Sequence, residues 1–438
     1  ASHTTAATVD GHKLTPAMVN YFYKEAYNSM SQNYGDMLSY IIDTDTPLDE
    51  QYYDEENGVT WADTFIEQGL SNAASMYAIY DEALANGVTL TDDDKTSIDA
   101  TISNMSLYAT YYGYSNVNGY ITAMYGSGCN EKNFREFLEL ETISNNYSQE
   151  VYNKPVYTET ELMDLYTADP NAYDSVDYRV FTISDSMFDE EDEDKLAELK
   201  KTMADEMLAA AEEGDEAFIQ AAYDHATEST KESYADDSYT LRTDVGYTDT
   251  QLSNWLFDTS RKTGDATSIE VEGIYYVAIF EARNDHDYAL PNVRHILISV
   301  SDTSDEEAMA SAKATAESLL AEYEAGEHTE DAFAAIGDAA YADGTAAESA
   351  RYEDITPGQM VEGFEDWCFE DGHQVGDTGI VETSYGYHVV FFSGFGTNYR
   401  LKLVEDDQRS TTYSDWLSSV SENTSYETVS FGMKFITK

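Results

Sequence analysis

Positive charge is what this 438-residue chain has least of. It carries 23 Lys and Arg residues against 85 Asp and Glu residues, which gives a formal net charge of −62. Because such a chain repels the phosphates of nucleic acids and of anionic membrane surfaces, its composition argues against both as partners. The same charge keeps the chain soluble and favours contacts with cationic partners or divalent cations.

Proline and cysteine are scarce as well, with 6 and 2 residues respectively. The two cysteines, Cys129 and Cys368, are too few for a disulfide scaffold. They leave a single disulfide open, but two buried free thiols are the favoured interpretation, because neither cysteine has a neighbouring histidine or a Cys-x-x-Cys partner. No apolar run is long enough to span a bilayer. No signal peptide is visible, and residues 1–8 are typical of a linker that continues an exported protein, although a cytoplasmic protein also fits.

Aromatic residues, by contrast, are abundant. The chain has 36 tyrosines and a hydrophobic content of 42%. This composition is sufficient for packed domains and argues against a disordered acidic chain. A chain of 438 residues predicts about two to four domains.

Residues 1–170 are predicted to form a helical lobe. Thr15 followed by proline is typical of a helix start, and residues 61–86 place apolar side chains at the spacing of one helix face. Thr91 and Asp94 form a pattern that resembles a capping box. The many tyrosines of this lobe are interpreted as core and interface packing, with a groove for unfolded, partly apolar polypeptide as the alternative.

A further helix is predicted in the C-terminal segment, residues 399–438. Because an isolated helix is marginally stable in water, this helix needs a packing partner. We expect it to form at residues 411–420 and to dock on the helical lobe. The tail at residues 429–436 is predicted to be a strand.

The region between the lobe and the C-terminal segment contains an internal repeat. Trp255 and Trp367 lie 112 positions apart, and the same offset separates the Gly-Asp pairs that follow them. Strand-like segments align on either side of these markers. The repeat predicts two tandem copies of one α+β domain, at residues 171–288 and 289–398, each an antiparallel sheet with surrounding helices.

The two copies differ at two positions that matter for chemistry. The second copy has one histidine in its first strand and one in its last strand, His295 and His388. When the copies are aligned, Arg179 and Tyr275 take these positions in the first copy. The first copy is therefore predicted to be idle, and the second copy is predicted to carry the chemistry.

Four motifs follow one another in the second copy. They are Arg294-His295-Ile-Leu, Pro357-Gly-Gln-Met360, Phe364-Glu-Asp and Thr383-x-Tyr-Gly-Tyr-His388. In this order, residues 291–394 resemble the parvulin family of peptidyl-prolyl isomerases. The resemblance implies a catalytic set made of His295, Asp343, Thr383 and His388. It implies a substrate-binding set made of Met360, Phe364 and Tyr385, and it implies neither a cofactor nor a metal.

The residue types suit this reaction. Rotation about an X–Pro bond faces a barrier of about 18–20 kcal/mol, because amide resonance is lost in the twisted geometry. A site need only hold the proline ring and favour the twisted amide, and Met360 and Phe364 supply an apolar socket. The resemblance implies that neutral His295 and His388 pass a hydrogen bond between them, and that Asp343 orients this network or polarises the amide. The distance between the two rings is the decisive observation, because a gap beyond one water would exclude the site.

Each residue also has a purely structural interpretation. Met360 and Phe364 are ordinary core side chains if they do not face a substrate. Asp343 precedes a glycine, which is typical of a turn, and Thr383 fits a plain strand position. One departure from the family concerns the segment around Ser349 and Ala350, which lacks two glycines that parvulins commonly have at this place. Their loss predicts a loop of altered shape beside the site and reduced catalytic efficiency.

The whole arrangement of lobe, idle copy, second copy and returning helix is similar to exported foldases of the PrsA type and periplasmic chaperones of the SurA type. This resemblance implies an extracellular or cell-envelope protein, anchored as a lipoprotein on the outer face of the membrane. Its partners would be unfolded or newly exported polypeptides. The predicted function is prolyl cis–trans isomerisation combined with chaperone activity. A non-catalytic holdase that uses both copies as binding modules is the alternative, and an acidic cation-binding surface protein is a third hypothesis.

Overall fold

The computed structural model describes residues 4–438, so the beginning of the predicted linker lies outside the described residues. The described chain forms two compact units, one made of residues 4–156 with 407–438 and the other of residues 157–406. Its helices and antiparallel sheets confirm the predicted multidomain α+β class. Within the part of the chain that the structure describes, no helix combines the length and apolar character needed to cross a membrane.

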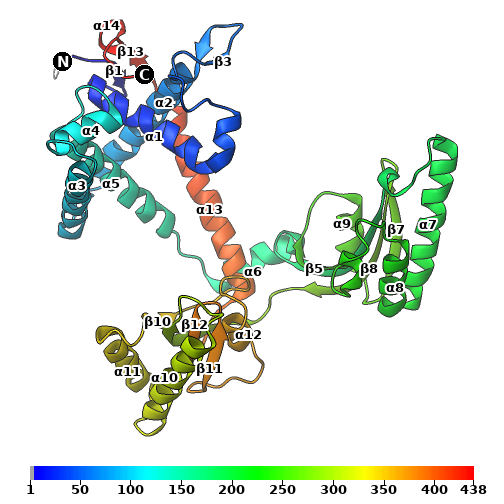
Figure 1. The fold of residues 1–438 in the computed structure, drawn as a ribbon. Helices are drawn as coiled ribbons and strands as arrows, with labels where there is room; N and C mark the ends of the chain where they lie inside the picture. The colour runs from blue at the N-terminus through cyan, green and yellow to red at the C-terminus, as the bar shows by residue number, and fades with distance from the viewer. Residues whose placement is uncertain (1–3) are drawn as a thin grey trace. The chain divides into compact units, whose positions relative to one another are not determined.

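The first unit is mainly helical (Figure 1). Its helices are α1 Pro16–Tyr34, η1 Gly35–Tyr40, α2 Trp61–Ala85, α3 Asp92–Tyr111, α4 Val117–Tyr125, α5 Glu131–Asn153, the later part of α13 Tyr399–Glu422, and α14 Ser430–Met433. Its strands are β1 Ala7–Val9, β2 His12–Leu14, β3 Tyr52–Asp54, β4 Val59–Thr60 and β13 Tyr426–Thr428. Because β1 pairs with β13, the two ends of the described chain lie side by side in this unit (Figure 1).

Side-chain caps fix where the predicted helices begin. The Thr15 hydroxyl accepts the backbone N–H of Met18 at 3.3 Å and starts α1. At the start of α3 the Thr91 hydroxyl accepts the Asp94 N–H at 3.1 Å, and the Asp94 carboxylate accepts the Thr91 N–H at 2.8 Å. Both predicted starts are confirmed, because each cap satisfies backbone donors that have no partner inside the helix.

The C-terminal part of the chain completes the core of this unit. Trp416 and Leu417 of α13 pack with Ile79 of α2 and with Tyr147 of α5. The Trp416 indole N–H also donates to the Glu82 carboxylate at 3.3 Å. These contacts supply the apolar partner that a lone terminal helix needs.

The predicted strand at residues 429–436 is wrong. The strand β13 ends at Thr428, and the following residues form the short helix α14. Gly432 lies so close to the backbone of Thr5 that a side chain at this position would collide with it. This close approach, which only glycine permits, holds the tail as a helical turn beside the N-terminal strand.

The tyrosines of the first unit fall into two groups. Tyr21 and Tyr23 of α1 are completely buried in the core. By contrast, Tyr108, Tyr111 and Tyr112 at the end of α3 keep 54%, 81% and 62% of their surface exposed. Core packing therefore accounts for the first group and leaves an exposed aromatic cluster unexplained.

The second unit contains two antiparallel sheets, each with helices beside it (Figure 1). Each sheet has four strands, and the strand order is the same in both. The first copy has the order β6-β5-β8-β7 and consists of β5 Ser175–Ile183, α7 Glu193–Glu213, α8 Asp215–His225, β6 Leu241–Gly246, α9 Gln251–Leu256, β7 Ala266–Val271 and β8 Ile274–Asn284, with η3 Asp185–Met187 and η4 Ser233–Ala235. The second copy has the order β10-β9-β12-β11 and consists of β9 Ala289–Ser299, α10 Glu306–Glu324, α11 Glu330–Ala342, β10 Glu348–Tyr352, α12 Phe364–Cys368, β11 Thr378–Thr383 and β12 Gly386–Asn398.

The helix α6 Glu159–Ala168 and the turn η2 Pro170–Ala172 also belong to the second unit, whereas the sequence predicts a helical lobe that extends to residue 170. The helix α13 begins in the second unit and ends in the first. Both cysteines are buried free thiols, as the favoured interpretation expects.

The strand registers correct the alignment of the two copies. Phe280 exchanges backbone hydrogen bonds with the Gly264-Asp265 pair, as Phe392 does with Gly376-Asp377, so the offset of 112 continues through β8 and β12. Tyr276, and not Tyr275, therefore occupies the position of His388. In the same way, Val180 pairs with Ala278 as His295 pairs with Val390, so Val180 takes the position of His295. The first copy still lacks both histidines.

Arg179 instead occupies the position of Arg294, and each of the two arginines pairs with a carboxylate at the start of a helix. Arg179 lies 3.6 Å from the carboxylate of Asp215, the first residue of α8. Arg294 lies 2.8 Å from the carboxylate of Glu330, the first residue of α11. In each copy an arginine on the first strand thus ties the sheet to the start of a helix.

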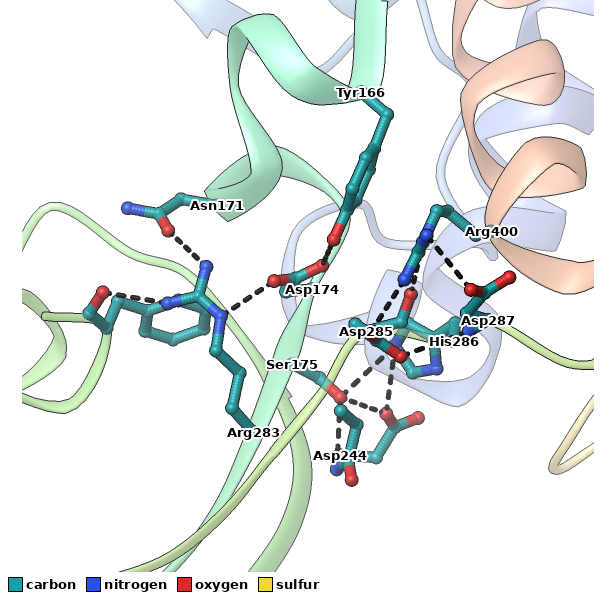
Figure 2. Close-up of polar contacts among 12 residues, drawn as sticks. Tyr166, Asn171, Asp174, Ser175, Asp244, Arg283, Asp285, His286, Asp287 and Arg400 are labelled. Atoms are coloured by element: carbon teal, nitrogen blue, oxygen red, sulfur yellow. Dashed lines mark hydrogen bonds and ion pairs between the residues drawn. The ribbon is translucent and has the colours of Figure 1, made fainter. Parts of the chain in front are cut away.

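A buried ion pair anchors the start of the first copy, as Figure 2 shows. The Asp174 side chain is 3% exposed and accepts hydrogen bonds from Arg283 Nε at 2.7 Å and from the Tyr166 hydroxyl at 2.8 Å. Arg283 also donates to the Asn171 side chain at 2.6 Å and to the backbone carbonyl of Phe257 at 2.8 Å. Because these partners surround both charges, the pair can exist away from water.

Next to this pair, Ser175, His286 and Asp244 form a second polar cluster (Figure 2). The Ser175 hydroxyl contacts the Asp244 carboxylate and lies 3.2 Å from His286 Nε2, and Asp244 approaches the same ring nitrogen at 3.7 Å. A catalytic triad places its acid on the opposite ring nitrogen. The cluster therefore links the start of β5 to β6 and to the segment after β8, and its geometry is not that of a catalytic triad.

Arg400, at the start of α13, fixes the connection between the copies. Its guanidinium lies 2.7 Å from the Asp285 carboxylate, donates to the Asp285 carbonyl at 2.8 Å, and stacks 4.4 Å from the centre of the Tyr166 ring. Figure 2 shows Arg400 between the linker at residues 285–287 and Tyr166. The linker is thus held by charge, hydrogen bonding and a ring contact together.

Replacing Asp174 by alanine tests how much its ion pair with Arg283 stabilises the second unit. The change leaves Arg283 charged and without its carboxylate in a mostly buried place, so we expect the free energy of unfolding of the second unit to fall by about 3–5 kcal/mol. The matched control is Asp205→Ala, which removes one carboxylate from an exposed ion pair with Lys201 and should cost less than about 0.5 kcal/mol. Urea unfolding measures both values, and equal effects of the two changes would contradict the interpretation.

Candidate active site

The two histidines of the second copy face the same side of its sheet. β9 and β12 are neighbours at the centre of the order β10-β9-β12-β11. Side chains alternate between the faces of a strand, so Ile296 and Val389 pack against α10 and α11, whereas His295 and His388 face Phe364 of α12. The site therefore lies on the face of the sheet opposite the two long helices.

The histidine rings share a hydrogen bond. His295 Nδ1 lies 3.0 Å from His388 Nδ1, and the rings stack with centres 5.2 Å apart. The other ring nitrogen of His388, Nε2, lies 2.7 Å from the Thr383 hydroxyl. The distance that the sequence analysis singles out as decisive is thus a direct hydrogen-bond distance.

Gly386 makes this geometry possible. It has a φ of 129° at the start of β12, two residues before His388. A side chain here would collide with the carbonyl oxygen of Ile298 on β9. Glycine thus permits the close approach of the two strands that carry the histidines.

Burial keeps both histidines neutral. Their exposed fractions are 3% for His295 and 5% for His388. Burial, together with the adjacent His295, lowers the pKa of His388 to about 4. Burial also lowers the pKa of His295, against an opposing effect of the Glu348 carboxylate. Two neutral imidazoles that share a hydrogen bond must each adopt one defined tautomer.

Glu348 selects between the two possible tautomer pairs. Its carboxylate lies 3.7 Å from His295 Nε2, which has no hydrogen-bond partner. A carboxylate beside this atom favours a proton on it, since a bare lone pair would face a negative charge. His295 Nδ1 then accepts the proton of His388 Nδ1, and His388 Nε2 accepts the hydroxyl proton of Thr383. The lone pairs of the Thr383 oxygen are left for other donors, one of which is the Tyr385 backbone N–H at 3.2 Å.

Apolar side chains border the histidines. The Phe364 ring is 2% exposed, and its centre lies 5.4 Å from His295 and 5.2 Å from His388. Met360 packs at the edge of the same cluster and is only partly buried. Glu365 holds the preceding loop, because its carboxylate accepts the backbone N–H groups of Gly358 at 2.9 Å and Met360 at 3.2 Å.

The structure brings most of the predicted site residues together. His295, His388 and Thr383 form one hydrogen-bonded chain, with Phe364 and Met360 beside it. Phe364 is a core side chain that forms the floor of the site, whereas Met360 is the more accessible of the two. Tyr385 projects from the turn between β11 and β12 with 57% of its surface exposed.

Asp343 does not join this network. It is the exposed residue that ends α11, and its carboxylate accepts the backbone N–H of Thr345 at 2.9 Å. Hydrogen bonds from Thr345 lower the pKa of Asp343. This placement corresponds to the turn interpretation, and the acid beside the histidines is Glu348, which the sequence analysis missed. Glu348 and Tyr352 lie on the same face of β10 as Ala350, which stands opposite His295, and this placement depends on the strand pairing and not on any spacing in the sequence.

The segment around Ser349 and Ala350 is a strand and not the loop of altered shape that the missing glycines predict. Residues Glu348–Tyr352 form β10, and neither Ser349 nor Ala350 has a positive φ. Ser349 faces the helices, where its hydroxyl lies 3.1 Å from the Asp338 carboxylate, and Ala350 stands opposite His295. Because the backbone is ordinary here, the missing glycines do not distort the site.

Comparison with known proteins agrees with this geometry. Residues 274–393 match the family model of the PPIC-type PPIase domain. The matched segment includes all of the histidines, hydroxyl and apolar side chains described above. The chain therefore contains a parvulin domain of the peptidyl-prolyl isomerase type. No curated protein matches the chain.

The depressed pKa values predict how stability depends on pH. An unfolded histidine takes up a proton near pH 6.5, whereas His388 in the fold stays neutral down to about pH 4. Between these values the unfolded chain binds more protons, so the free energy of unfolding falls as pH is lowered from about 6.5 to about 4, by up to about 3 kcal/mol for this group. Above about pH 6.5 the histidine is neutral in both the folded and the unfolded state, so none of this stability is lost.

The measurement is urea unfolding at pH values between about 4.5 and 7, the range in which an unfolded histidine gains a proton and the folded His388 does not. His388→Gln should flatten the pH dependence. His328→Gln, which changes an exposed histidine outside the site, should leave it as in the unmodified protein. A slope that His388→Gln does not change would contradict the assignment.

Proposed function

We propose that the second copy catalyses the cis–trans isomerisation of peptidyl-prolyl bonds. The observation that carries this proposal is the direct hydrogen bond between His295 and His388, extended to Thr383, beside the apolar Phe364 and inside the matched domain. The reaction needs no cofactor. It requires only that the site bind the twisted amide better than the planar one.

The chemistry of the network suits this task. In the twisted amide the nitrogen becomes pyramidal and gains a lone pair, because its conjugation with the carbonyl is lost. A fixed chain of neutral hydrogen-bonding groups can respond to this change without the cost of reorganising water. Met360 and the edge of Phe364 offer the proline ring an apolar contact. The buried histidines hold the Thr383 hydroxyl, which is the more accessible end of the chain.

We propose that the protein also acts as a chaperone for unfolded or newly exported polypeptides, at the cell envelope or outside the cell. The exposed tyrosines Tyr108, Tyr111 and Tyr112 support this part of the proposal. Aromatic rings with a polar end bind extended polypeptides of varied sequence at low entropic cost. The PrsA-type and SurA-type resemblance, the lipoprotein anchor and the role of the first copy as an idle parvulin-like module belong to the same proposal.

Proline isomerisation by the full chain tests the catalytic part. His388→Ala removes the centre of the hydrogen-bonded chain, so kcat/KM should fall by about five- to hundredfold, the equivalent of about 1–3 kcal/mol. Met360→Ala removes an apolar contact with the substrate and should raise KM more than it lowers kcat. NMR exchange spectroscopy on a short X–Pro peptide measures both.

The matched control is Glu382→Gln, which lies on the edge strand β11 and faces the opposite side of the sheet, where Glu382 accepts the Tyr387 hydroxyl at 2.8 Å. Its activity should equal that of the unmodified protein. Activity of the unmodified protein no higher than that of His388→Ala would exclude the enzyme. In that case, binding of a permanently unfolded protein that survives His388→Ala and Met360→Ala would establish the alternative, a non-catalytic holdase.

A further inference from the structure

The charge around the second-copy site is unusually one-sided. Residues 289–398 contain three basic side chains, Arg294, Lys313 and Arg351. Arg294 and Arg351 face the helix side of the sheet, where both bind the Glu330 carboxylate, at 2.8 Å and 2.9 Å. Arg351 also pairs with Glu353. Lys313 belongs to α10, which packs on the same far face. The described part of this domain therefore has no basic side chain on the site face.

Glu348 is the acid that this arrangement leaves uncompensated. The register of β10 puts Glu348, Ala350 and Tyr352 on the site face, with Ala350 opposite His295. The Tyr352 hydroxyl donates to one carboxylate oxygen of Glu348 at 2.8 Å, and the other oxygen lies 3.7 Å from His295 Nε2. Neither neighbour carries a positive charge, since burial keeps His295 neutral. No positive charge therefore lies beside the carboxylate, and 44% of its side chain is exposed.

Its position is within reach of a bound substrate. Glu348 approaches His295, whose ring centre is 5.4 Å from Phe364, and Tyr352 joins the same group with its ring centre 6.4 Å from Phe364. A peptide whose proline ring contacts Met360 and the edge of Phe364 therefore lies beside the residues that Glu348 contacts, His295 and Tyr352. The Nε2 atom of His295 is buried, has no hydrogen-bond partner and lies 3.7 Å from the same carboxylate.

We propose that the site selects prolines next to a lysine or arginine, and that Glu348 receives the cationic side chain. This inference rests on the proposed isomerase function. The absence of a basic side chain on this face disfavours prolines that follow a phosphorylated or acidic residue, because such a residue would meet only negative charge. The net charge of −62 acts in the same direction by drawing basic polypeptides to the protein.

The test compares peptides that differ only in the charge beside proline. Pairs with lysine or methionine, and with glutamate or glutamine, are placed before or after the proline and assayed with the full chain. We expect kcat/KM for the lysine peptide to exceed that for the methionine peptide by about two- to fivefold, as partly exposed ion pairs contribute. The glutamate peptide should be the poorest of the four. Raising the salt concentration from about 0.02 M to about 0.5 M should remove the difference.

Two variants assign the preference to its residue. Glu348→Gln should reduce the lysine-to-methionine ratio to near one, whatever it does to the rate, since Glu348 also acts through His295. Glu382→Gln removes the same charge from the opposite face of the sheet and should keep the ratio. Glu348→Asp should restore part of it. An unmodified protein without preference, or a ratio that Glu348→Gln leaves intact, overturns the proposal.

A failure of the proposed function gives a different result. If the unmodified protein isomerises none of the peptides, the isomerase proposal fails, and the charge preference is then read from binding of the same peptides by fluorescence anisotropy. Tighter binding of the lysine peptide that disappears in Glu348→Gln supports the cationic subsite even then. Equal binding of all four peptides overturns it.

Discussion

The hydrogen bond between the two histidine rings depends on a single strand register, and most features of the second copy serve that register. His295 stands opposite Val390 and His388 opposite Leu297, so the histidines are diagonal neighbours on one face of adjacent strands. A shift by one residue would send one ring to the opposite face. Gly386 allows the strands to approach, and the helix-side core fixes the alternation. The site is thus a property of the sheet before it is a property of any one side chain.

Burial gives this pair its chemical character. Both rings are almost completely removed from water, which makes their charged forms unfavourable and leaves two neutral groups that must agree on a tautomer. A single exposed carboxylate at the edge of the sheet can then orient the whole chain of hydrogen bonds. The first copy has the same strand order but keeps only the structural arginine, and Val180 and Tyr276 stand where the histidines are. A fold can therefore persist after the residues suited to chemistry are gone.

Much of this could be predicted from sequence patterns, and the failures have physical causes. Helix starts at Thr15 and Thr91 follow from local capping, which involves residues only three apart. The histidine pair, Thr383 and Phe364 follow from ordered motifs. Asp343 and Glu348 could not be separated by spacing, because the choice depends on where α11 ends and where β10 begins. The alignment of Arg179 and Tyr275 failed for a related reason: a one-residue error in register changes the face of the sheet. The turn at Gly432 depends on contact with Thr5, which no local pattern reveals.

The way the chain returns to its first unit has a consequence for the order in which the protein is built. The second unit is continuous in sequence, and its strand pairs join residues within residues 157–406. In the first unit, by contrast, β1 pairs with β13 and the helix core includes Trp416. These contacts join residues that are separated in sequence by the whole of the second unit. Long-range closure of this kind is slow, because chain entropy must be lost before contacts compensate it. During synthesis from the N-terminus, the sheets that carry the site can therefore be complete before residues 407–438 are made, and the apolar surfaces of the helical unit stay uncovered until then.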